Sequence, residues 1–492
     1  MVYNLRGLLN PDGASPPGYP FLRMLSVCPQ AIHLKPGSVC LHRKKLMEST
    51  KDTKLGGLQS TFSRRNLLKG AVAVSAAANV SEVFGQQPTG APRGTVWLYI
   101  GTYTSVSSGG SGGNGEGIYL CELNLSTGKL TVLRLVAPGL PATLINASTA
   151  SPSTLAIDPG GNYLYAGNEI FSPHGSVSAY RINRMTGDLT LLNALPALGA
   201  PAHVGVDKFR KYLFAAEYVG SYFEVFPILA NGSLGPAVFQ MKTVGNVGPT
   251  KATSAPPGSF AISAHEGPDG HPHQMETDPS NQWVVGSDAG QDRIYVWKLT
   301  VGGTPPLTPA AIPFVNTPPG DGPRHFAFHP NGVWMYSIQE EGDTIIFWRF
   351  NPATGSLTNT QQVSSLPPGF VGTVFTSEIR VSADGRFVYG VNRLNDTICV
   401  FSIGHDGRLT QVSHASTLGD YPRIITIDPS GRFMVSGNQR ADNVTTFRIS
   451  SGGGGGGQGD DRSGESNGGD GSLTFTGDYT AVGSPSGMVF LI

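Results

Sequence analysis

A hairpin unit that recurs in one register limits what this chain can fold into. In its clearest copy, an apolar strand enters through Pro323 and turns at a Pro-Asn-Gly sequence, and a second strand ends at Gln339 and Glu340. Five further turns occupy the equivalent position along the chain: Pro159, Lys208, Pro279, Ala383 and Pro429. In all of these copies but one, a proline stands seven residues before the turn. The unit therefore occurs six times intact.

A seventh copy is split between the two ends of the repeat region. Its second strand is predicted over 96–102, and the equivalent of a first strand over 485–491. Repeats of roughly 40–50 residues with about four short strands each are typical of β-propellers. We therefore predict an all-β fold, a seven-bladed β-propeller whose ring is closed by pairing of the C-terminal strand with N-terminal strands.

The outer strands of each blade follow the same register. Third strands are predicted over 117–124, 175–182, 222–228, 292–299, 343–350, 396–403 and 442–449. Fourth strands are predicted to follow a Gly-Xaa-Leu sequence, which begins at Gly128, Gly187, Gly232, Gly355, Gly407 and Gly471. The chain has 66 Gly in 492 residues, about twice the average usage, as tight turns require.

The region before the repeats has a different character. Residues 1–46 show no periodic pattern, and we expect them to be unstructured, with Met47 as the true start. Residues 47–87 resemble a twin-arginine export signal, because Arg64 and Arg65 precede an Ala-rich run too short to span a bilayer. Residues 88–94 are a predicted linker, and 95–492 the propeller with loop insertions at 241–270 and 450–471. We expect export to the periplasm or beyond, with no stable membrane anchor after signal removal.

The charge balance and the cysteines limit which partners, disulfides and metal sites we expect. Lys plus Arg and Asp plus Glu both total 34, so nothing favours nucleic acid or an anionic membrane surface. We expect a monomer that acts on a small molecule. The four cysteines suggest neither a disulfide framework nor a metal site. The spacing of His265, Glu266, Asp269, His271 and His273 matches no compact zinc site, so we expect no metal and no cofactor.

Polar residues gather where strand one begins and strand two ends, and antiparallel pairing brings these ends to the same edge of the sheet. The strand-one starts offer His203, His273, Arg324, His325, Glu378 and Arg423. The strand-two ends offer Asn168, Glu169, Glu217, Asp288, Glu340, Asn392, Arg393, Asn438 and Gln439. A structural alternative is that the Asn and Asp residues cap turns and that the arginines form salt bridges between blades. We expect this rim to be open to water.

Several short sequences carry a family resemblance: Tyr99-Ile-Gly-Thr-Tyr-Thr, Leu155-Ala-Ile-Asp-Pro, Asn168-Glu169, His271-Pro-His-Gln, Pro323-Arg-His-Phe, Asn392-Arg393 and Pro422-Arg423. From about residue 95 to the end, the chain resembles the propeller-type lactonase family. That family includes seven-bladed 6-phosphogluconolactonases and fungal 3-carboxy-cis,cis-muconate lactonizing enzymes. The chain departs from the family pattern at Glu217, where Asn is usual, at Gln339, where Asn is usual, and at Ile424, where an aromatic residue or His is common.

The resemblance implies a catalytic site at His273, Arg324, Glu340 and Arg393. Residues expected to bind substrate around it are His203, His325, Glu378, Arg423, Asn168 and Glu169. The implied reaction is hydrolysis of a sugar lactone, as in a 6-phosphogluconolactonase. Glu340 or His273 would take the proton of the attacking water, and Arg324 would stabilise the oxyanion. Arg393 and Arg423 would bind an anionic group of the substrate.

Two other functions fit the same residues. Cyclisation of a carboxymuconate would use the same anion anchors, with proton transfer at carbon instead of attack by water. An exported propeller without catalytic activity would use the rim to bind a sugar or a protein.

Overall fold

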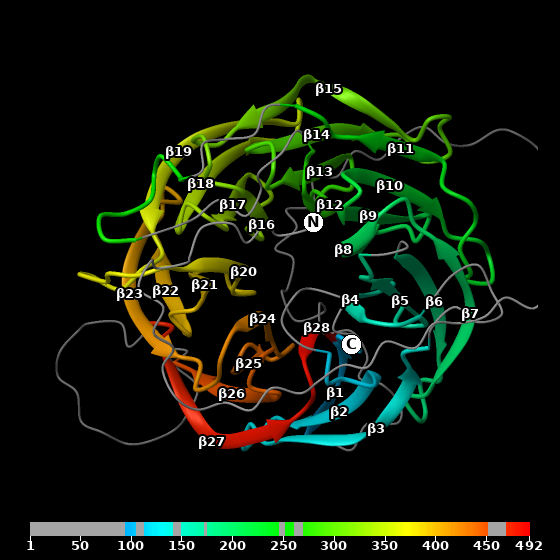
Figure 1. Ribbon diagram of the computed structural model, residues 1–492, viewed down its shortest axis with the longest axis horizontal. Coiled ribbons are helices and arrows are strands. Elements are labelled where there is room, and N and C mark those ends of the chain that lie inside the picture. Colours follow the sequence, from blue (N-terminus) through cyan, green and yellow to red (C-terminus); the bar gives the residue numbers. More distant parts are fainter. Residues whose placement is uncertain are drawn as a thin grey trace, which may run out of the picture. The chain divides into compact units, whose positions relative to one another are not determined.

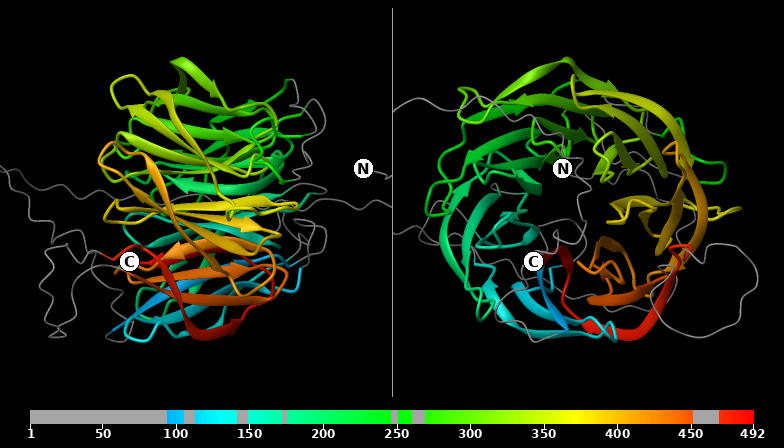
Figure 2. Two further views of the ribbon diagram at one scale, coloured as in Figure 1. Left: turned by 90° about the vertical axis from the view of Figure 1, so that its left-hand side faces the viewer. Right: turned by 180° about the vertical axis from the view of Figure 1, so that it is seen from behind.

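Each sequence repeat folds into one four-stranded antiparallel sheet, and seven such sheets stand around a central axis (Figure 1). The computed structural model describes residues 94–104, 113–140, 149–171, 175–245, 251–259, 269–450 and 469–492. Within these residues it contains 28 strands, four to a blade. Seen from the side and from behind, the sheets form a ring with their inner strands facing the axis (Figure 2).

The innermost strands are β28 (Pro485–Leu491), β4 (Pro152–Ile157), β8 (Ala200–Val206), β12 (Pro272–Thr277), β16 (Pro323–Phe328), β20 (Phe375–Val381) and β24 (Pro422–Ile427). The second strands are β1 (Thr95–Thr102), β5 (Tyr163–Asn168), β9 (Tyr212–Val219), β13 (Trp283–Asp288), β17 (Trp334–Gln339), β21 (Phe387–Arg393) and β25 (Phe433–Asn438). Five of the inner strands begin at a proline, a position that needs no ladder hydrogen bond from its nitrogen.

The third strands are β2 (Gly117–Asn124), β6 (Ser176–Ile182), β10 (Tyr222–Pro227), β14 (Arg293–Leu299), β18 (Thr344–Asn351), β22 (Thr397–Ile403) and β26 (Asn443–Ile449). The outer strands are β3 (Leu130–Pro138), β7 (Leu189–Pro196), β11 (Phe239–Lys242), β15 (Leu307–Asn316), β19 (Ser356–Ser364), β23 (Leu409–Ser416) and β27 (Leu473–Ala481).

The predicted closure of the ring is confirmed. Strand β28 pairs antiparallel with β1, from Trp97 opposite Leu491 to Gly101 opposite Gly487. The resulting sheet has the order β28-β1-β2-β3, so one blade combines both ends of the repeat region. Without β28, the inner edge of β1 would be left unpaired.

The hydrophobic core is divided among the blade interfaces. In each interface, the apolar face of one sheet packs on the next, as Tyr336 and Phe347 pack with Ile379 and Val388. Tyrosines hydrogen bond to the neighbouring blade at four Gly-Xaa-Leu turns. Tyr336 Oη donates to the carbonyl of Gly407 at 2.8 Å, where a φ of 88° is one that glycine tolerates best.

Two sequence predictions of strand bounds are wrong in detail. Gly232 is not followed directly by a fourth strand, because Leu234 forms only an isolated bridge to Ile228 and β11 begins at Phe239. Four third strands begin one residue later than predicted, after an Asp with a φ of 50–53°: Asp292, Asp343, Asp396 and Asp442. Three of these carboxylates cap the entry of the next blade, as Asp396 Oδ1 does by accepting from the Tyr421 amide at 2.9 Å.

Several predicted segments lie outside the described residues. They are the unstructured 1–46, the signal segment 47–87, nearly all of the linker 88–94, and parts of both loop insertions. The described part of the first insertion packs on the propeller, since the Thr253 amide donates to the Pro319 carbonyl at 3.0 Å and Ser254 hydrogen bonds to Asp321. Within the part of the chain that the structure covers, no helix has the length and apolarity needed to cross a membrane.

Candidate active site

A β-bulge at the start of every inner strand leaves one residue, or two in β20, outside the pairing at the inner edge of the ring. In β16, Pro323 pairs with Gln339 and His325 with Ile338, so that Arg324 has no partner residue. A register shift of this kind occurs in all seven inner strands. The residues that it leaves without a pairing partner are Ser486, Ser153, Ala202, His273, Arg324, the Ser377-Glu378 pair and Arg423. Bulges commonly re-aim side chains beside active sites. Here one bulge per repeat builds the first layer of a polar ring.

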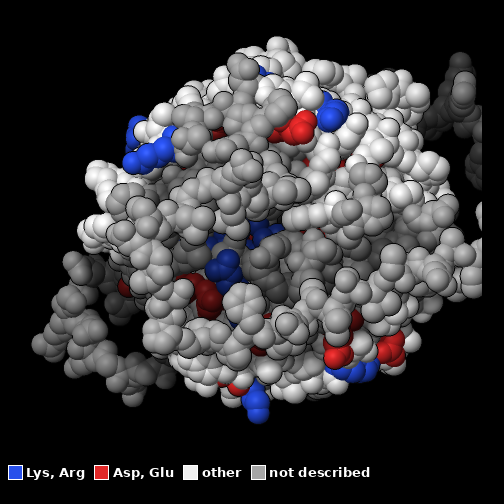
Figure 3. All heavy atoms as spheres, in the orientation of Figure 1, with Lys and Arg blue, Asp and Glu red and all other residues white. Residues whose placement is uncertain are grey.

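One residue at or directly after the end of each second strand builds the second layer. Equivalent positions are occupied by Tyr103, Glu169, Tyr218, Ala289, Glu340, Arg393 and Gln439. In five of these positions the backbone amide donates to a carbonyl just before the inner strand of the same blade, as Glu340 does to Gly322 at 2.7 Å. These bonds fix the residue at the edge where the bulged side chains lie. Figure 3 shows positively and negatively charged atoms together in the hollow at the centre of this face.

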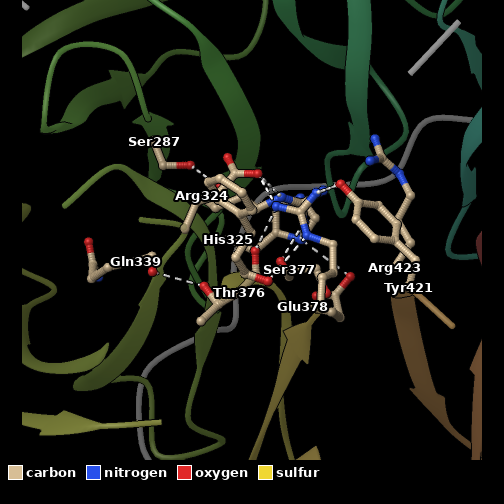
Figure 4. Close-up of polar contacts among 12 residues, drawn as sticks. Ser287, Arg324, His325, Gln339, Thr376, Ser377, Glu378, Tyr421 and Arg423 are labelled. Carbon is tan, nitrogen blue, oxygen red and sulfur yellow. Dashed lines mark hydrogen bonds and ion pairs between the residues drawn. The ribbon is translucent and has the colours of Figure 1, made fainter. Parts of the chain in front are cut away.

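One charge cluster joins three of the four residues of the predicted catalytic set. Arg324 Nε lies 3.6 Å from Glu340 Oε1, and Arg393 Nη2 makes a close ion pair with the same oxygen. Arg393 also donates to the Thr376 carbonyl at 3.0 Å and to Tyr421 Oη at 3.1 Å. Arg324 donates to the Ser377 carbonyl, and the close-up shows it among residues from neighbouring blades (Figure 4). Burial and the nearby Arg393 lower the pKa of Arg324 to about 10, which leaves it charged at neutral pH.

A second charge cluster lies around Glu169. Its Oε2 accepts hydrogen bonds from Tyr103 Oη at 2.5 Å and Ser153 Oγ at 2.8 Å, and Arg423 Nη2 lies 3.4 Å away. The Arg423 guanidinium stands over the Tyr103 ring, 5.1 Å from its centroid. Burial raises the pKa of the Tyr103 hydroxyl well above its usual value, so it remains a donor.

Three histidines follow on adjacent blades. The rings of His273 and His325 are 4.9 Å apart, and those of His203 and His325 are 5.9 Å apart. His325 Nδ1 lies 3.2 Å from Glu378 Oε2, and His203 Nε2 lies 3.3 Å from Glu276 Oε1. Burial lowers the pKa of His273 well below its usual value, with Arg324 as the next cause. Burial also lowers the pKa of His325, to about 4, so both rings are neutral at pH 7.

The structure places Asn168 within its own blade. Its Nδ2 donates to Ser176 Oγ at 3.0 Å and Ser178 Oγ at 3.1 Å, and its side chain is fully buried. Asp288, Asn392 and Asn438 likewise hydrogen bond to turns and third strands. Glu217 occupies the same register without a hydrogen-bond partner for either oxygen among the described residues. Burial, with Glu224 and Glu169 as further causes, raises the pKa of Glu217 well above its usual value.

The expectation that this rim is open to water is wrong. Arg324 is 1% exposed, His273 3%, Arg393 4% and Glu340 7%. Side chains of neighbouring blades contact one another here, as Arg393 does Glu340. Ion pairs at this site are therefore buried ones, whose disruption costs more than that of surface pairs.

A cavity of about 1210 Å³ runs along the inner strands of the ring. Five of the ten predicted site residues line it: His203, Arg324, His325, Glu378 and Arg423. The other five do not. Of these, Glu340 and Glu169 form ion pairs with lining residues, and Arg393 forms an ion pair with Glu340. His273 contacts His325 through its ring.

Sequence reasoning missed the role of three tyrosines. Tyr103 binds Glu169, Tyr421 binds Arg393, and the Tyr218 ring packs against His273 at 5.5 Å. Arg393 lowers the pKa of Tyr421, which is also flanked by Arg440 at 3.8 Å from the ring centroid. The sequence could have indicated two of these tyrosines by their position, because Tyr103 and Tyr218 stand where Glu340 stands in its own repeat.

The described residues contain no group of three or more His, Cys, Asp or Glu that could hold a metal ion. Of the metal candidates in the first insertion, His265 and Glu266 lie outside the described residues. His271 is engaged with the propeller, its Nδ1 lying 2.8 Å from the Tyr218 carbonyl. The absence of a metal from the reaction stays a prediction.

Comparison with known proteins agrees with this architecture. The family model described as "Lactonase, 7-bladed beta-propeller" matches residues 97–457. A 6-phosphogluconolactonase of Bacillus subtilis is 33% identical over 351 residues, covering 71% of this chain and 90% of that protein. A 6-phosphogluconolactonase of Formosa agariphila is 28% identical over 357 residues, covering 71% and 92%.

A solved structure is also similar. The periplasmic gluconolactonase of Pseudomonas aeruginosa has 27% sequence identity and a TM-score of 0.64, covering 81% of this chain and 99% of that one. The repeat register, the closed ring and the match to the family model over most of the repeat region lead to one conclusion: the chain belongs to the seven-bladed β-propeller lactonase family.

Proposed function

We propose that this protein hydrolyses a sugar lactone and that the reaction takes place at the polar ring formed by the bulged residues. The observation that carries the proposal is the pair of buried guanidiniums, Arg324 and Arg393, that share one oxygen of Glu340 beside a neutral histidine. The similar proteins named 6-phosphogluconolactonase and gluconolactonase support the choice of a sugar lactone as the substrate of this protein.

The charges suit a reaction that develops one negative charge. Arg324, Arg393 and Arg423 face two carboxylates, Glu340 and Glu169, which leaves one positive charge in excess among these five. The carbonyl oxygen of a lactone gains one negative charge when water attacks the ring. Donors held in a buried site stabilise such a charge without having to reorganise. Arg324, which lines the cavity, is the proposed donor to this oxygen.

Glu340 is better suited to hold the arginines than to act as the base. Its Oε1 is engaged by both guanidiniums, which fixes their positions relative to each other. Arg423 also lines the cavity, and its forked donors suit a hydroxyl, carboxylate or phosphate of the substrate. The proton of the attacking water then goes to a neutral imidazole, a group typical of general-base catalysis near neutral pH.

A substrate panel tests this function. The purified protein is assayed with sugar lactones that carry or lack a phosphate, and with carboxymuconate. Acid release from a lactone well above the spontaneous rate supports the proposal. Lactone formation from carboxymuconate would instead assign a cyclase, and saturable sugar binding without turnover would assign a binding protein.

Export is part of the proposal. Arg64 and Arg65 precede the Ala-rich run in the order of a twin-arginine signal, and a similar structure is that of a periplasmic gluconolactonase. Replacing both arginines with lysine should keep the protein in the cytoplasm, which cell fractionation measures. Unchanged secretion of that variant would reject this route.

A further inference from the structure

His325 and Glu378 form a pair that the lactone reaction can use, and this inference rests on the proposed function. We infer that His325, oriented by Glu378, is the base that takes the proton from the attacking water. His325 Nδ1 lies 3.2 Å from Glu378 Oε2, and both residues line the central cavity. The close-up places His325 between Arg324 and Glu378 (Figure 4).

The pairing determines where the imidazole proton lies. Two groups contact His325 Nδ1: Glu378 Oε2 at 3.2 Å, which as an ionised carboxylate only accepts hydrogen bonds, and Arg324 Nη1 at 3.4 Å, which only donates. The carboxylate is the nearer of the two, and Arg324 has a separate acceptor in the Ser377 carbonyl, so we place the ring hydrogen on Nδ1. The lone pair is then on Nε2, which is buried and has no hydrogen-bond partner within the described part of the chain. A buried polar atom without a partner in the protein is a position where water or substrate is expected. A base oriented by a third group is the arrangement that activates nucleophiles in many hydrolases.

Glu378 is itself held in place. Its Oε1 accepts the Ile379 amide at 3.0 Å, and Arg380 Nη2 lies 3.6 Å from its Oε2. Burial alone would raise the pKa of Glu378, but Arg380 and His325 outweigh it and lower the pKa to about 2. The carboxylate is therefore ionised throughout the pH range in which His325 is neutral.

The two neighbouring histidines lack one part of this arrangement. No carboxylate among the described residues bonds to the His273 ring to select its tautomer, and its Nδ1 is buried without a partner there. His203 is paired with Glu276 through Nε2, and its Nδ1 faces the Met275 amide at 3.5 Å. Of the three, His325 alone combines an orienting carboxylate with an unpartnered nitrogen among the described residues.

The step balances without a further reactant. The water oxygen bonds to the lactone carbonyl carbon while its proton passes to His325 Nε2, and the carbonyl π electrons move to the oxygen beside Arg324. When the carbonyl re-forms, the ring C–O bond breaks. The departing ring oxygen takes the proton from the imidazolium and becomes a hydroxyl. The product is a hydroxy acid, which releases its proton to solvent.

The first test does not need a substrate. Nitrogen NMR of the histidine rings, with the His325 signals assigned by comparison with His325→Asn, should show a neutral ring protonated on Nδ1 at pH 7. The groups that face this ring are Arg324 on its own strand, Glu378 and Arg380 on β20, His203 on β8 and His273 on β12. An imidazolium at pH 7, or a ring protonated on Nε2, would overturn the inference.

The second test separates this inference from the proposed function. If the wild type hydrolyses a lactone, His325→Asn should lower kcat by roughly 10²–10⁴ with KM changed less than about threefold, because Asn keeps a donor to Glu378 but lacks the Nε2 base. Glu378→Gln should lower kcat at least about tenfold, since it no longer selects the tautomer. Wild-type kcat in His325→Asn would overturn the inference and leave the proposed function standing, whereas no wild-type turnover would reject the function alone.

The fall of kcat/KM at low pH, the acid limb of the pH profile, and a control variant provide further tests of His325. Because His325 must be neutral, kcat/KM of the wild type should fall as the pH drops through about 4, and this limb should be missing in His325→Asn. His329→Asn, in the turn of the same hairpin, is the control and should keep the wild-type kcat, since the His329 ring bonds to the Gly385 carbonyl of the next blade and to the Asn331 amide of its own turn, away from the cavity. A purely structural role for His325 would instead lower Tm and raise KM while the acid limb remained.

Discussion

Glu340→Gln should weaken both the stability and the activity of the protein. Glu340 Oε1 is the shared partner of Arg324 and Arg393, whose side chains are 1% and 5% exposed. Neutralising the carboxylate leaves two buried cations facing each other without a counter-charge. Breaking a buried ion pair by removing one partner costs about 3–5 kcal/mol.

The expected change in Tm follows from the size of the propeller. The entropy of unfolding is about 2.1 cal/mol/K per residue, or roughly 0.8 kcal/mol/K for about 400 residues. A loss of about 4 kcal/mol should therefore lower Tm by about 5 °C, measured by scanning calorimetry. Turnover should fall by roughly 10²–10³ as Arg324 loses its position beside the oxyanion.

A surface pair in a neighbouring blade serves as the control. Asp406 and Arg408 are 3.5 Å apart with side chains 58% and 54% exposed, so Asp406→Asn should cost about 0–1 kcal/mol and shift Tm by about 1 °C or less. If Glu340→Gln shifted Tm no more than Asp406→Asn, the buried ion cluster would not stabilise the ring as reasoned.

Three other outcomes are expected. Burial raises the pKa of Asp343 to about 9, so the folded protein favours the protonated carboxyl and loses stability as the pH rises from about 4 toward 9. Asp343→Asn should therefore raise Tm at pH 8 and leave it nearly unchanged at pH 4. No gain in Tm at pH 8 would contradict this. Deleting 485–492 removes strand β28 and should give aggregated protein in size-exclusion chromatography, whereas a soluble monomer of wild-type Tm would argue against the closure. Gly407→Ala should lower the free energy of unfolding, measured in urea, more than Gly302→Ala does. Both glycines have a positive φ, but only a Cβ at position 407 would meet the Phe347 ring, at 2.3 Å. Equal losses would show that the Phe347 ring can move aside.

The fold could be predicted from sequence because each repeat carries local signals that do not depend on its neighbours. Prolines begin inner strands, and Gly-Xaa-Leu turns begin most outer ones. The split seventh copy predicted the pairing of β28 with β1. The signal failed at Gly232 because blade three places four residues between Leu234 and its outer strand, and spacing alone does not reveal which segment pairs.

The site could be predicted only in part. The register placed Arg324, Glu340 and His325 at one edge, since antiparallel pairing requires it. It gave no indication of contacts between blades, so the Arg423–Glu169 pair and the Glu378–His325 pair were found only in the structure. Burial of these residues was also missed, because strand ends are usually exposed and the contacts between blades join residues distant in sequence.

The central claim is that lactone hydrolysis takes place at the bulged polar ring, and the most direct measurement is acid release from gluconolactone in a pH-stat by the wild type and by Arg324→Ala. After subtraction of the spontaneous rate, the wild type should turn over the lactone and Arg324→Ala should be slower by roughly 10²–10³, the loss expected for one donor to the oxyanion. Equal rates for the two proteins, both above the spontaneous rate, would place the reaction elsewhere on the molecule and contradict the account.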